Sequence, residues 1–325
     1  MEKESKKISQ RVRFSFVKIL TGSDLSLRRL PLMAVESKNS GPVVWLTGCV
    51  HGDEVGGIAI IQEIFKKIRK RPLLKGSLYA FPIMNPVGFE TVSRHIALSK
   101  EDLNRSFPGN ERGSVAERIA YKIFTTITQT NPTIVLDLHN DWRESLPYAF
   151  IDAEKGITDK ETYEKTKIFA KKTGLPAILD VDVIEHSLTF SLINKGIPAL
   201  TLELGESYVV IESNVEYGIK AVLNILSHLE MTPPPDKSFG YPMPETIKNK
   251  ILKYSYRPAS STSGIIRFLV KPGDFIKKNQ PLAKIYNTFG KLLETLKAPS
   301  DCILLGYSDF SIAFPGTPII SLGII

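Results

Sequence analysis

Apolar runs alternate with helical patterns through the first two-thirds of the chain. Four of the runs predict buried strands, at residues 42–50, 77–83, 133–139 and 198–205. The last two are nearly continuous in apolar residues, as is typical of central strands covered on both faces. Helical spacing is found at 55–71, and a further helix is predicted to begin with the capping box Ser114-Val-Ala-Glu117. Strands that alternate with helices predict an α/β sheet with helices on both sides.

The pattern changes near Met231. Residues 231–244 contain five prolines, and proline is excluded from helix interiors and central strands because it lacks a backbone donor. Beyond about Lys253 the chain shows short strand-like runs separated by Gly/Pro turns, which predicts an all-β domain. We therefore predict three parts, which are a catalytic domain at 1–235, a proline-rich linker at 236–253 and a C-terminal β domain at 254–325.

The segment Gly48-Cys-Val-His51-Gly-Asp-Glu54 lies between a predicted strand and a predicted helix. In α/β sheets, ligands bind beyond the carboxyl ends of the strands. A catalytic zinc ion takes three protein ligands and leaves one position open for water, so His51 and Glu54 need one more partner. The chain has five histidines, and His139 is the best third ligand because it also ends a buried strand.

Four short motifs follow one another along the chain: His51-Gly-Asp-Glu54, Asp102-Leu-Asn-Arg105-Ser-Phe-Pro-Gly109, Asp137-Leu-His139 and Leu202-Glu203-Leu-Gly205. In this order they resemble the succinylglutamate desuccinylase/aspartoacylase family, which is part of the zinc-carboxypeptidase-like superfamily. The resemblance covers about residues 40–230. It implies a three-layer α/β/α catalytic domain with a mixed sheet and one zinc ion per chain.

The same resemblance implies roles for seven side chains, as metal ligands, substrate-binding groups or catalytic groups. The zinc ligands are His51, Glu54 and His139, the carboxylate-binding pair is Asn104 and Arg105, and the catalytic residues are the general base Glu203 and the carbonyl-polarising Arg94. Arginine suits the binding role because its planar guanidinium makes two parallel hydrogen bonds to a carboxylate. The candidates to support the metal-binding histidines are Asp53, Asp137 and Glu206.

The C-terminal domain resembles a biotinyl/lipoyl-type barrel-sandwich module. The resemblance is carried by Gly264-Ile-Ile through Gly273-Asp274, by Gln280-Pro-Leu and by Ala298-Pro-Ser-Asp. Carrier modules hold their cofactor on a lysine at a hairpin tip, but here that position falls on or beside Phe289, and Lys291 is displaced from it. We therefore predict that this module carries no cofactor. It is expected either to limit substrate size at the site or support oligomer contacts, or only to add stability.

Charge and composition change this picture little. The net charge is +8, which could attract acidic partners. The densest basic cluster, at 66–71, ends a predicted helix, where cations complement the helix dipole, and it lacks interleaved aromatic residues for base stacking. We expect no nucleic-acid partner. Two cysteines and no apolar run of signal-peptide or membrane-spanning length predict a cytoplasmic protein without a membrane partner.

The function that the sequence favours is a zinc-dependent deacylase. Its substrate is expected to be an N-acyl amino acid or a similar small amide that carries a carboxylate. A metallocarboxypeptidase or peptide amidase would use the same chemistry on a peptide, and pocket size separates the two. A non-catalytic metal- or ligand-binding protein is the alternative from another class. The acyl group, the amino acid and the oligomeric state stay open, with a homo-oligomer among the options.

Overall fold

The structure is a computed structural model that describes residues 10–21, 25–245 and 247–325. Its main feature is one long mixed sheet with the strand order β1-β2-β4-β3-β5-β9-β7-β8-β10-β17-β15-β12, and β6 pairs with β15. In the catalytic part the strands are β1 Arg13–Thr21, β2 Leu27–Glu36, β3 Val43–Gly48, β4 Ser77–Phe81, β5 Ile134–Asp141, β6 Glu144–Ser145, β7 Tyr148–Ile151, β8 Ala177–Leu179 and β9 Ala199–Glu206. The four strands predicted from apolar runs are confirmed as β3, β4, β5 and β9.

The centre of the sheet is parallel, since β4, β3, β5 and β9 all run in one direction. The flanking pairs β1–β2, β2–β4 and β7–β9 are antiparallel. The register places Gly48 opposite Leu138, and His139 opposite Glu203. Because neighbouring parallel strands end at the same edge of a sheet, the segments that follow β3, β5 and β9 meet there.

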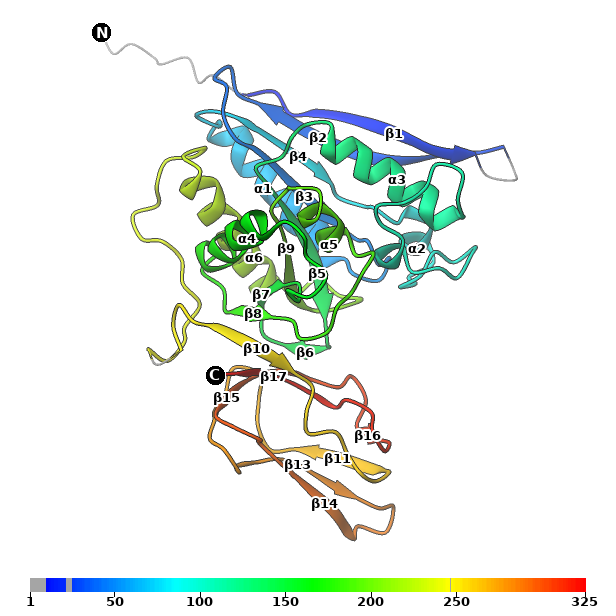
Figure 1. The fold of residues 1–325 in the computed structure, drawn as a ribbon, viewed down its shortest axis with the longest axis vertical. Helices are drawn as coiled ribbons and strands as arrows, with labels where there is room; N and C mark the ends of the chain where they lie inside the picture. The colour runs from blue at the N-terminus through cyan, green and yellow to red at the C-terminus, as the bar shows by residue number, and fades with distance from the viewer. Residues whose placement is uncertain (1–9, 22–24, 246) are drawn as a thin grey trace.

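Helices cover both faces of this sheet (Figure 1). They are α1 Gly56–Lys70, α2 Pro86–Glu90, α3 Val115–Thr128, α4 Lys160–Lys172, α5 Leu188–Ile193 and α6 Glu212–His228, with a 3-10 turn at Leu103–Arg105. On one face α1 packs against α6, and on the other α3 packs against α5. Successive strand residues point to opposite faces, so Leu138 contacts Gly57 of α1, while His139 points towards the α5 side. The predicted α/β/α layers are confirmed.

The C-terminal domain continues the catalytic sheet. Strand β10, Ile251–Ser255, pairs in parallel with β8 and antiparallel with β17. It therefore begins inside the segment predicted to be a linker, and the division at 235 and 253 stays a prediction. The remaining strands of this sheet are β12 Phe275–Ile276, β15 Cys302–Tyr307 and β17 Ile320–Ile324.

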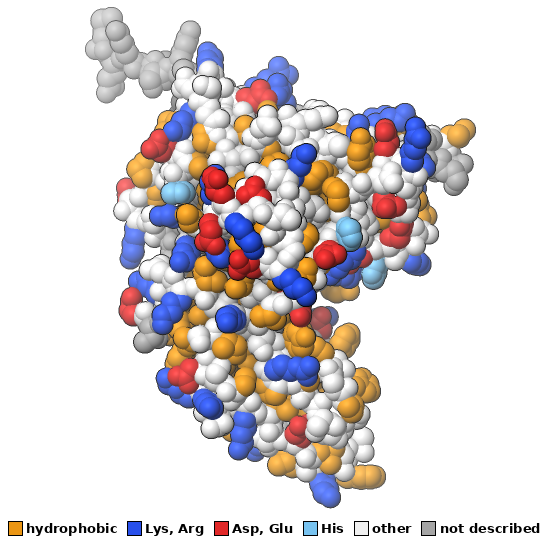
Figure 2. Space-filling view, in the orientation of Figure 1, with side chains coloured by type: hydrophobic (Ala, Val, Ile, Leu, Met, Phe, Trp, Pro, Cys, Tyr) orange, Lys and Arg blue, Asp and Glu red, His pale blue; other side chains and the backbone are white. Residues whose placement is uncertain are grey.

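A second sheet, in the order β14-β13-β11-β16, faces these strands across an apolar core. Its strands are β11 Gly264–Phe268, β13 Pro281–Tyr286, β14 Leu292–Lys297 and β16 Ile312–Ala313. Together the sheets form the small lower lobe in Figures 1 and 2. The β13–β14 hairpin presents Phe289 at its tip, with 94% of its surface exposed. The predicted all-β region and the position of this hairpin are confirmed.

Where the two lobes meet, a separate apolar cluster forms the junction. It combines side chains from the catalytic domain with side chains from both ends of the β domain, namely Leu146, Tyr148, Ile178, Ile247, Leu252, Ile303 and Leu305. Continuous strand pairing and this buried cluster make the lobes parts of one structure rather than two units joined by a flexible tether.

This junction predicts a clear stability difference between two leucines. Leu252→Ala in β10 should cost about 2–5 kcal/mol, because the 2%-exposed side chain would leave a cavity at the junction. Leu292→Ala in β14 should lower the free energy of unfolding by less than about 0.5 kcal/mol, since 46% of the surface of Leu292 is already exposed. Urea unfolding of both variants provides the measurement. Equal midpoints would show that the lobes do not stabilise each other.

Candidate functional site

His51 and Glu54 lie in the short loop between β3 and α1. The loop is fixed against α2 and the segment after it, because the Gly52 backbone N–H donates to the Ser93 carbonyl at 3.0 Å. A Cβ at Gly52 would lie 1.9 Å from the Gly88 carbonyl carbon, so only glycine fits there. The backbone thus holds the two side chains in a fixed relation before any ligand binds.

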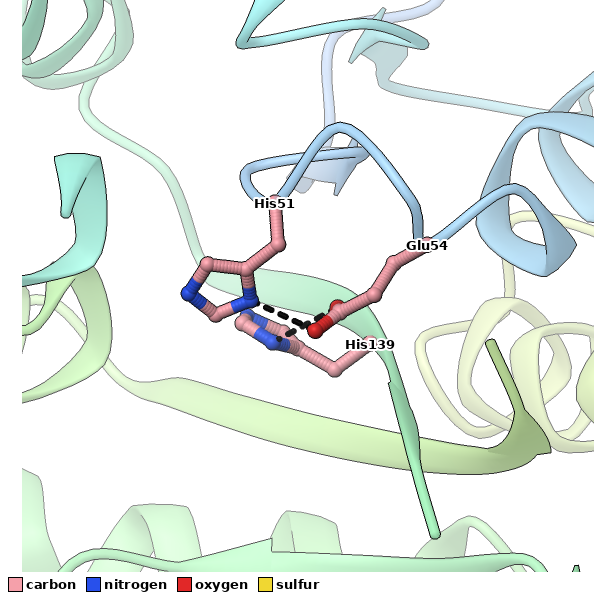
Figure 3. Close-up of side chains that lie close together, drawn as sticks. All are labelled: His51, Glu54 and His139. Carbon is pink, nitrogen blue, oxygen red and sulfur yellow. Dashed lines mark hydrogen bonds and ion pairs between the residues drawn. The ribbon is translucent and has the colours of Figure 1, made fainter. Parts of the chain in front are cut away.

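The structure brings His139, at the end of β5, against this loop. His51 Nδ1 lies 2.5 Å from Glu54 Oε1, and His139 Nδ1 lies 3.1 Å from Glu54 Oε2. Figure 3 shows both imidazoles turned towards the one carboxylate. All three residues are buried, and one donor atom from each lies within 4.8 Å of the others. This is a donor set that could hold a single metal ion.

The outer nitrogens of the two imidazoles also have carboxylate partners. His51 Nε2 lies 3.2 Å from Asp102 Oδ1, and His139 Nε2 lies 2.8 Å from Asp137 Oδ2. A carboxylate that accepts the outer N–H fixes the tautomer, so that the lone pair of Nδ1 faces the centre of the cluster. Histidines that ligate metals commonly have such a partner. The residues present therefore fit a metal ion. Each of the three side chains directs a possible ligand atom towards the centre of the cluster.

Charges in the cluster are strongly coupled. Although burial acts in the opposite direction, His51 and His139 lower the pKa of the Glu54 carboxyl. Burial alone would lower the pKa of His139, but Asp137 and Glu54 raise it well above its ordinary value. Both shifts arise from the attraction between the buried carboxylates and the charged form of the two imidazoles. Such surroundings favour positive charge at the centre, either as protons or as a metal cation.

Glu203 lies opposite His139 on β9 and lines the same cavity. Its Oε2 is buried and accepts no hydrogen bond within the described part of the chain. Burial and the neighbouring Asp141 raise the pKa of Glu203 well above the range of an ordinary carboxyl. Asp141 itself accepts a hydrogen bond of 2.7 Å from the Tyr148 hydroxyl. An unpartnered carboxylate with a raised pKa is suited to proton transfer.

The predicted arginines and asparagine also reach this cavity. Arg94 spans the cluster, with its guanidinium 3.5 Å from Glu54 Oε1 and 3.4 Å from Asp102 Oδ2. Asn104 accepts a 2.9 Å hydrogen bond from the Leu188 N–H, which orients its amide. Arg105 is exposed and donates to the Asn104 carbonyl. All seven predicted side chains are thus gathered at one place, and their roles stay predictions.

The cavity that they share is small, about 190 Å³. Its described lining consists of the seven predicted residues together with Asn140, Asp141, Phe150, Asp152, Asp180, Ile184, Ser187, Thr189 and Thr201. Most of these nine residues are polar. The cavity lies beside the carboxyl ends of β5 and β9, where a site is expected from the sequence. It extends over Phe150 of the antiparallel strand β7 and over residues that follow β7 and β8.

Several supporting residues were not singled out from the sequence. Asp102, which contacts both His51 and Arg94, could have been found because it belongs to the same motif as Asn104. Asn140 donates its backbone N–H to Glu54 Oε2 at 3.1 Å, a contact that leaves no sequence signal. Among the candidates for histidine support, Asp137 contacts His139, whereas no contact of Asp53 or Glu206 with either histidine is found in the described residues.

Comparisons with known proteins agree with this geometry. The family model of the succinylglutamate desuccinylase/aspartoacylase catalytic domain matches residues 40–229. The N-alpha-acetyl-L-2,4-diaminobutyric acid deacetylase of Halomonas elongata is 27% identical over 288 residues, which are 85% of this chain and 80% of that protein. The family match covers more than half of the chain.

Solved structures show the same fold. The product-bound ectoine utilization protein EutE (DoeB) from Ruegeria pomeroyi has a TM-score of 0.78 at 20% identity, with 99% of this chain and 98% of that chain covered. A metallo-carboxypeptidase from Burkholderia cenocepacia matches 67% of this chain and 65% of its own, with a TM-score of 0.51 and 16% identity. The chain therefore belongs to the succinylglutamate desuccinylase/aspartoacylase family of amide-bond hydrolases.

Proposed function

We propose that this protein is a zinc-dependent deacylase that hydrolyses the amide bond of a small N-acyl amino acid. The observation that carries the proposal is the buried His51/Glu54/His139 set, which opens into a cavity shared with Glu203. Zinc is the metal that best suits two imidazoles and one carboxylate with an open position. When bound, it would supply Lewis acidity that acidifies water and polarises a carbonyl oxygen.

Glu203 is the proposed general base. Its free carboxylate oxygen accepts a proton from the attacking water, while the water oxygen forms the new bond to the amide carbon. The same carboxyl group then donates that proton to the leaving nitrogen as the carbon–nitrogen bond breaks. The products are a carboxylic acid and a free amine, so atoms and charges balance. Tyr148 lies opposite Glu203 on the neighbouring strand β7 and donates a hydrogen bond to Asp141.

The cationic side chains have two proposed tasks. Arg94 stabilises the negative charge that develops on the carbonyl oxygen during attack, and its contacts with Glu54 and Asp102 hold it at the cluster. Asn104 and Arg105 bind the carboxylate of the substrate. With the substrate fixed at this end, the scissile carbonyl is presented to the water and Glu203.

Cavity size favours a small substrate over a peptide. Its volume of about 190 Å³ is below the ~300 Å³ at which pockets for drug-sized ligands begin. The activity named for the Halomonas elongata relative, removal of an acetyl group from an amino acid derivative, agrees with this choice. A peptidase stays the alternative within enzymes, and a non-catalytic binding protein is the alternative from another class.

We also propose that the enzyme acts in the cytoplasm. Both cysteines, Cys49 and Cys302, are buried and free, as is common in reducing compartments. No helix in the described ranges is long and apolar enough to cross a membrane. On the face shown in Figure 2, lysines and arginines are scattered over both lobes, with acidic side chains among them.

The proposed function is tested by assaying the zinc-loaded protein against a panel of N-acetyl and N-succinyl amino acids, with matched dipeptides alongside. We expect turnover of one or more N-acyl amino acids and little turnover of peptides. Preferred cleavage of peptides would support the peptidase alternative. No cleavage by a fully metal-loaded protein would favour the binding protein.

Glu203→Gln should reduce kcat by about 10²–10⁴-fold, because the amide keeps the size of the side chain but cannot accept the proton. Metal content should not change, since Glu203 is outside the ligand set. The matched control is Glu161→Gln, which removes a carboxylate from the exposed face of α4. Wild-type turnover in the Glu203 variant would exclude it as the base.

Arg105→Lys should raise KM for substrates with a free carboxylate, because an ammonium group cannot reproduce two parallel hydrogen bonds. Activity on the corresponding amidated substrates should be low in both proteins. Arg112→Lys, at another exposed position, serves as the matched control. If the wild-type enzyme cleaves free-acid and amidated substrates equally well, Arg105 does not bind a carboxylate.

A further inference from the structure

A threonine interrupts the apolar strand that leads into the loop of His51 and Glu54. Strand β3 begins with four apolar residues, 43–46, and Thr47 follows them with none of its surface exposed. A buried hydroxyl group is costly unless it is hydrogen-bonded, and valine would suit a buried strand position at least as well if packing alone mattered. The hydroxyl of Thr47 therefore calls for an explanation that the proposed mechanism does not provide.

The Thr47 hydroxyl donates a hydrogen bond to Asp137 on the neighbouring strand β5. The two residues lie opposite each other in the parallel pairing of β3 with β5, and Thr47 Oγ1 is 2.7 Å from Asp137 Oδ1. Among the described residues, Thr47 is the one side chain that donates to this oxygen. Only 1% of Asp137 is exposed, so bulk water is not available to take the place of the hydroxyl.

The second oxygen of Asp137 is directed at a candidate metal ligand. Asp137 Oδ2 lies 2.8 Å from His139 Nε2, and the other nitrogen of that ring, Nδ1, lies 3.1 Å from Glu54 Oε2. Figure 3 shows the ring turned towards Glu54. Thr47, Asp137 and His139 thus form one buried chain of hydrogen bonds that ends at the candidate metal position.

Each hydrogen bond in this chain fixes the group that makes the next one. A carboxylate that is bound at one oxygen can still turn about the bond to its Cβ atom, whereas contacts at both oxygens hold its plane. The oriented carboxylate of Asp137 keeps the proton of His139 on Nε2, because an ionised carboxylate accepts hydrogen bonds and donates none. The lone pair of Nδ1 is then directed at the metal position.

We propose that Thr47 is a positioning residue of the metal site, which acts through Asp137 to orient His139 for binding zinc. The inference rests on the function proposed above, because it concerns the zinc ion of that function. Thr47 is not part of the described cavity lining, so it contacts neither substrate nor metal and takes no part in hydrolysis. Its effect is on how tightly the site holds its metal ion.

Removal of this one hydroxyl group tests the inference. Thr47→Val replaces the hydroxyl by a methyl group of similar size, and Thr47→Ser keeps the hydroxyl but removes the methyl group. We expect zinc to bind about tenfold more weakly to Thr47→Val, at the lower end of the ~10–100-fold effect of groups that orient metal ligands, because Thr47 acts through Asp137. Thr47→Ser should bind zinc nearly as tightly as the wild type. Competition with a chromogenic chelator measures the dissociation constants.

Thr166→Val is the matched control, because it removes another fully buried threonine hydroxyl, in α4 and outside the described cavity lining. The Thr166 hydroxyl donates to the Thr162 carbonyl at 3.1 Å, and its loss should leave the zinc affinity unchanged. Equal zinc affinity in Thr47→Val and the wild type would overturn the inference. Equal weakening in Thr47→Val and Thr47→Ser would overturn it too, because packing rather than the hydroxyl would then be the cause.

The ring of His139 provides a second measurement, which needs no variant of Thr47. In the zinc-loaded protein with isotopically labelled histidine, nuclear magnetic resonance should find the proton of His139 on Nε2, protected from exchange with water. The signal is assigned by its loss in His139→Gln. A proton on Nδ1 would overturn the inference even if Thr47→Val fails to fold.

These measurements separate the inference from the deacylase function. A wild-type protein that binds zinc and shows the expected effects of the variants, but cleaves no N-acyl amino acid, would contradict the deacylase function and support the inference. A wild-type protein that binds no zinc would overturn both. Zinc binding that is weakened in Thr47→Val and retained in Thr47→Ser is the result we expect.

Discussion

The site depends on the carboxylate of Glu54, which lies between two imidazoles. Its oxygens face His51 Nδ1 and His139 Nδ1 at 2.5 and 3.1 Å, and all three side chains are buried. Such a charge is stable in the interior only when it is paired and hydrogen-bonded. The surrounding contacts provide this, because Asp102 and Asp137 orient the histidines and the Asn140 N–H donates to Glu54.

Parallel strands bring the rest of the site to this carboxylate. His139 and Glu203 lie opposite each other on β5 and β9, so the distance between ligand set and base is fixed by backbone hydrogen bonds rather than by flexible loops. The β domain extends the same support. Strand β6, just beyond His139, pairs with β15, and the ring of Tyr254 from β10 packs against Phe150 in the cavity lining. The C-terminal lobe thus packs against the segment that follows His139, one of the three candidate metal ligands.

Much of this arrangement could be predicted from the sequence, since the central strands are long apolar runs and the histidines stand at their ends. Local patterns of that kind predict where β3, β5 and β9 lie, and hence which side chains meet. The pairing of β10 with β8 could not be predicted, because contacts between strands far apart in sequence leave no periodic signal. Thr47 was missed for a related reason. A threonine is also an ordinary residue of a strand, and only the register of β3 with β5 reveals its carboxylate partner.

The claim on which the other proposals depend is that His51, Glu54 and His139 together hold one zinc ion. Elemental analysis of the purified protein measures this most directly, in the wild type, in His139→Ala and in the control His228→Ala at the end of α6. We expect one zinc ion per chain in the wild type and in the control, and loss of the metal in His139→Ala. Full zinc content in the His139 variant would contradict this claim.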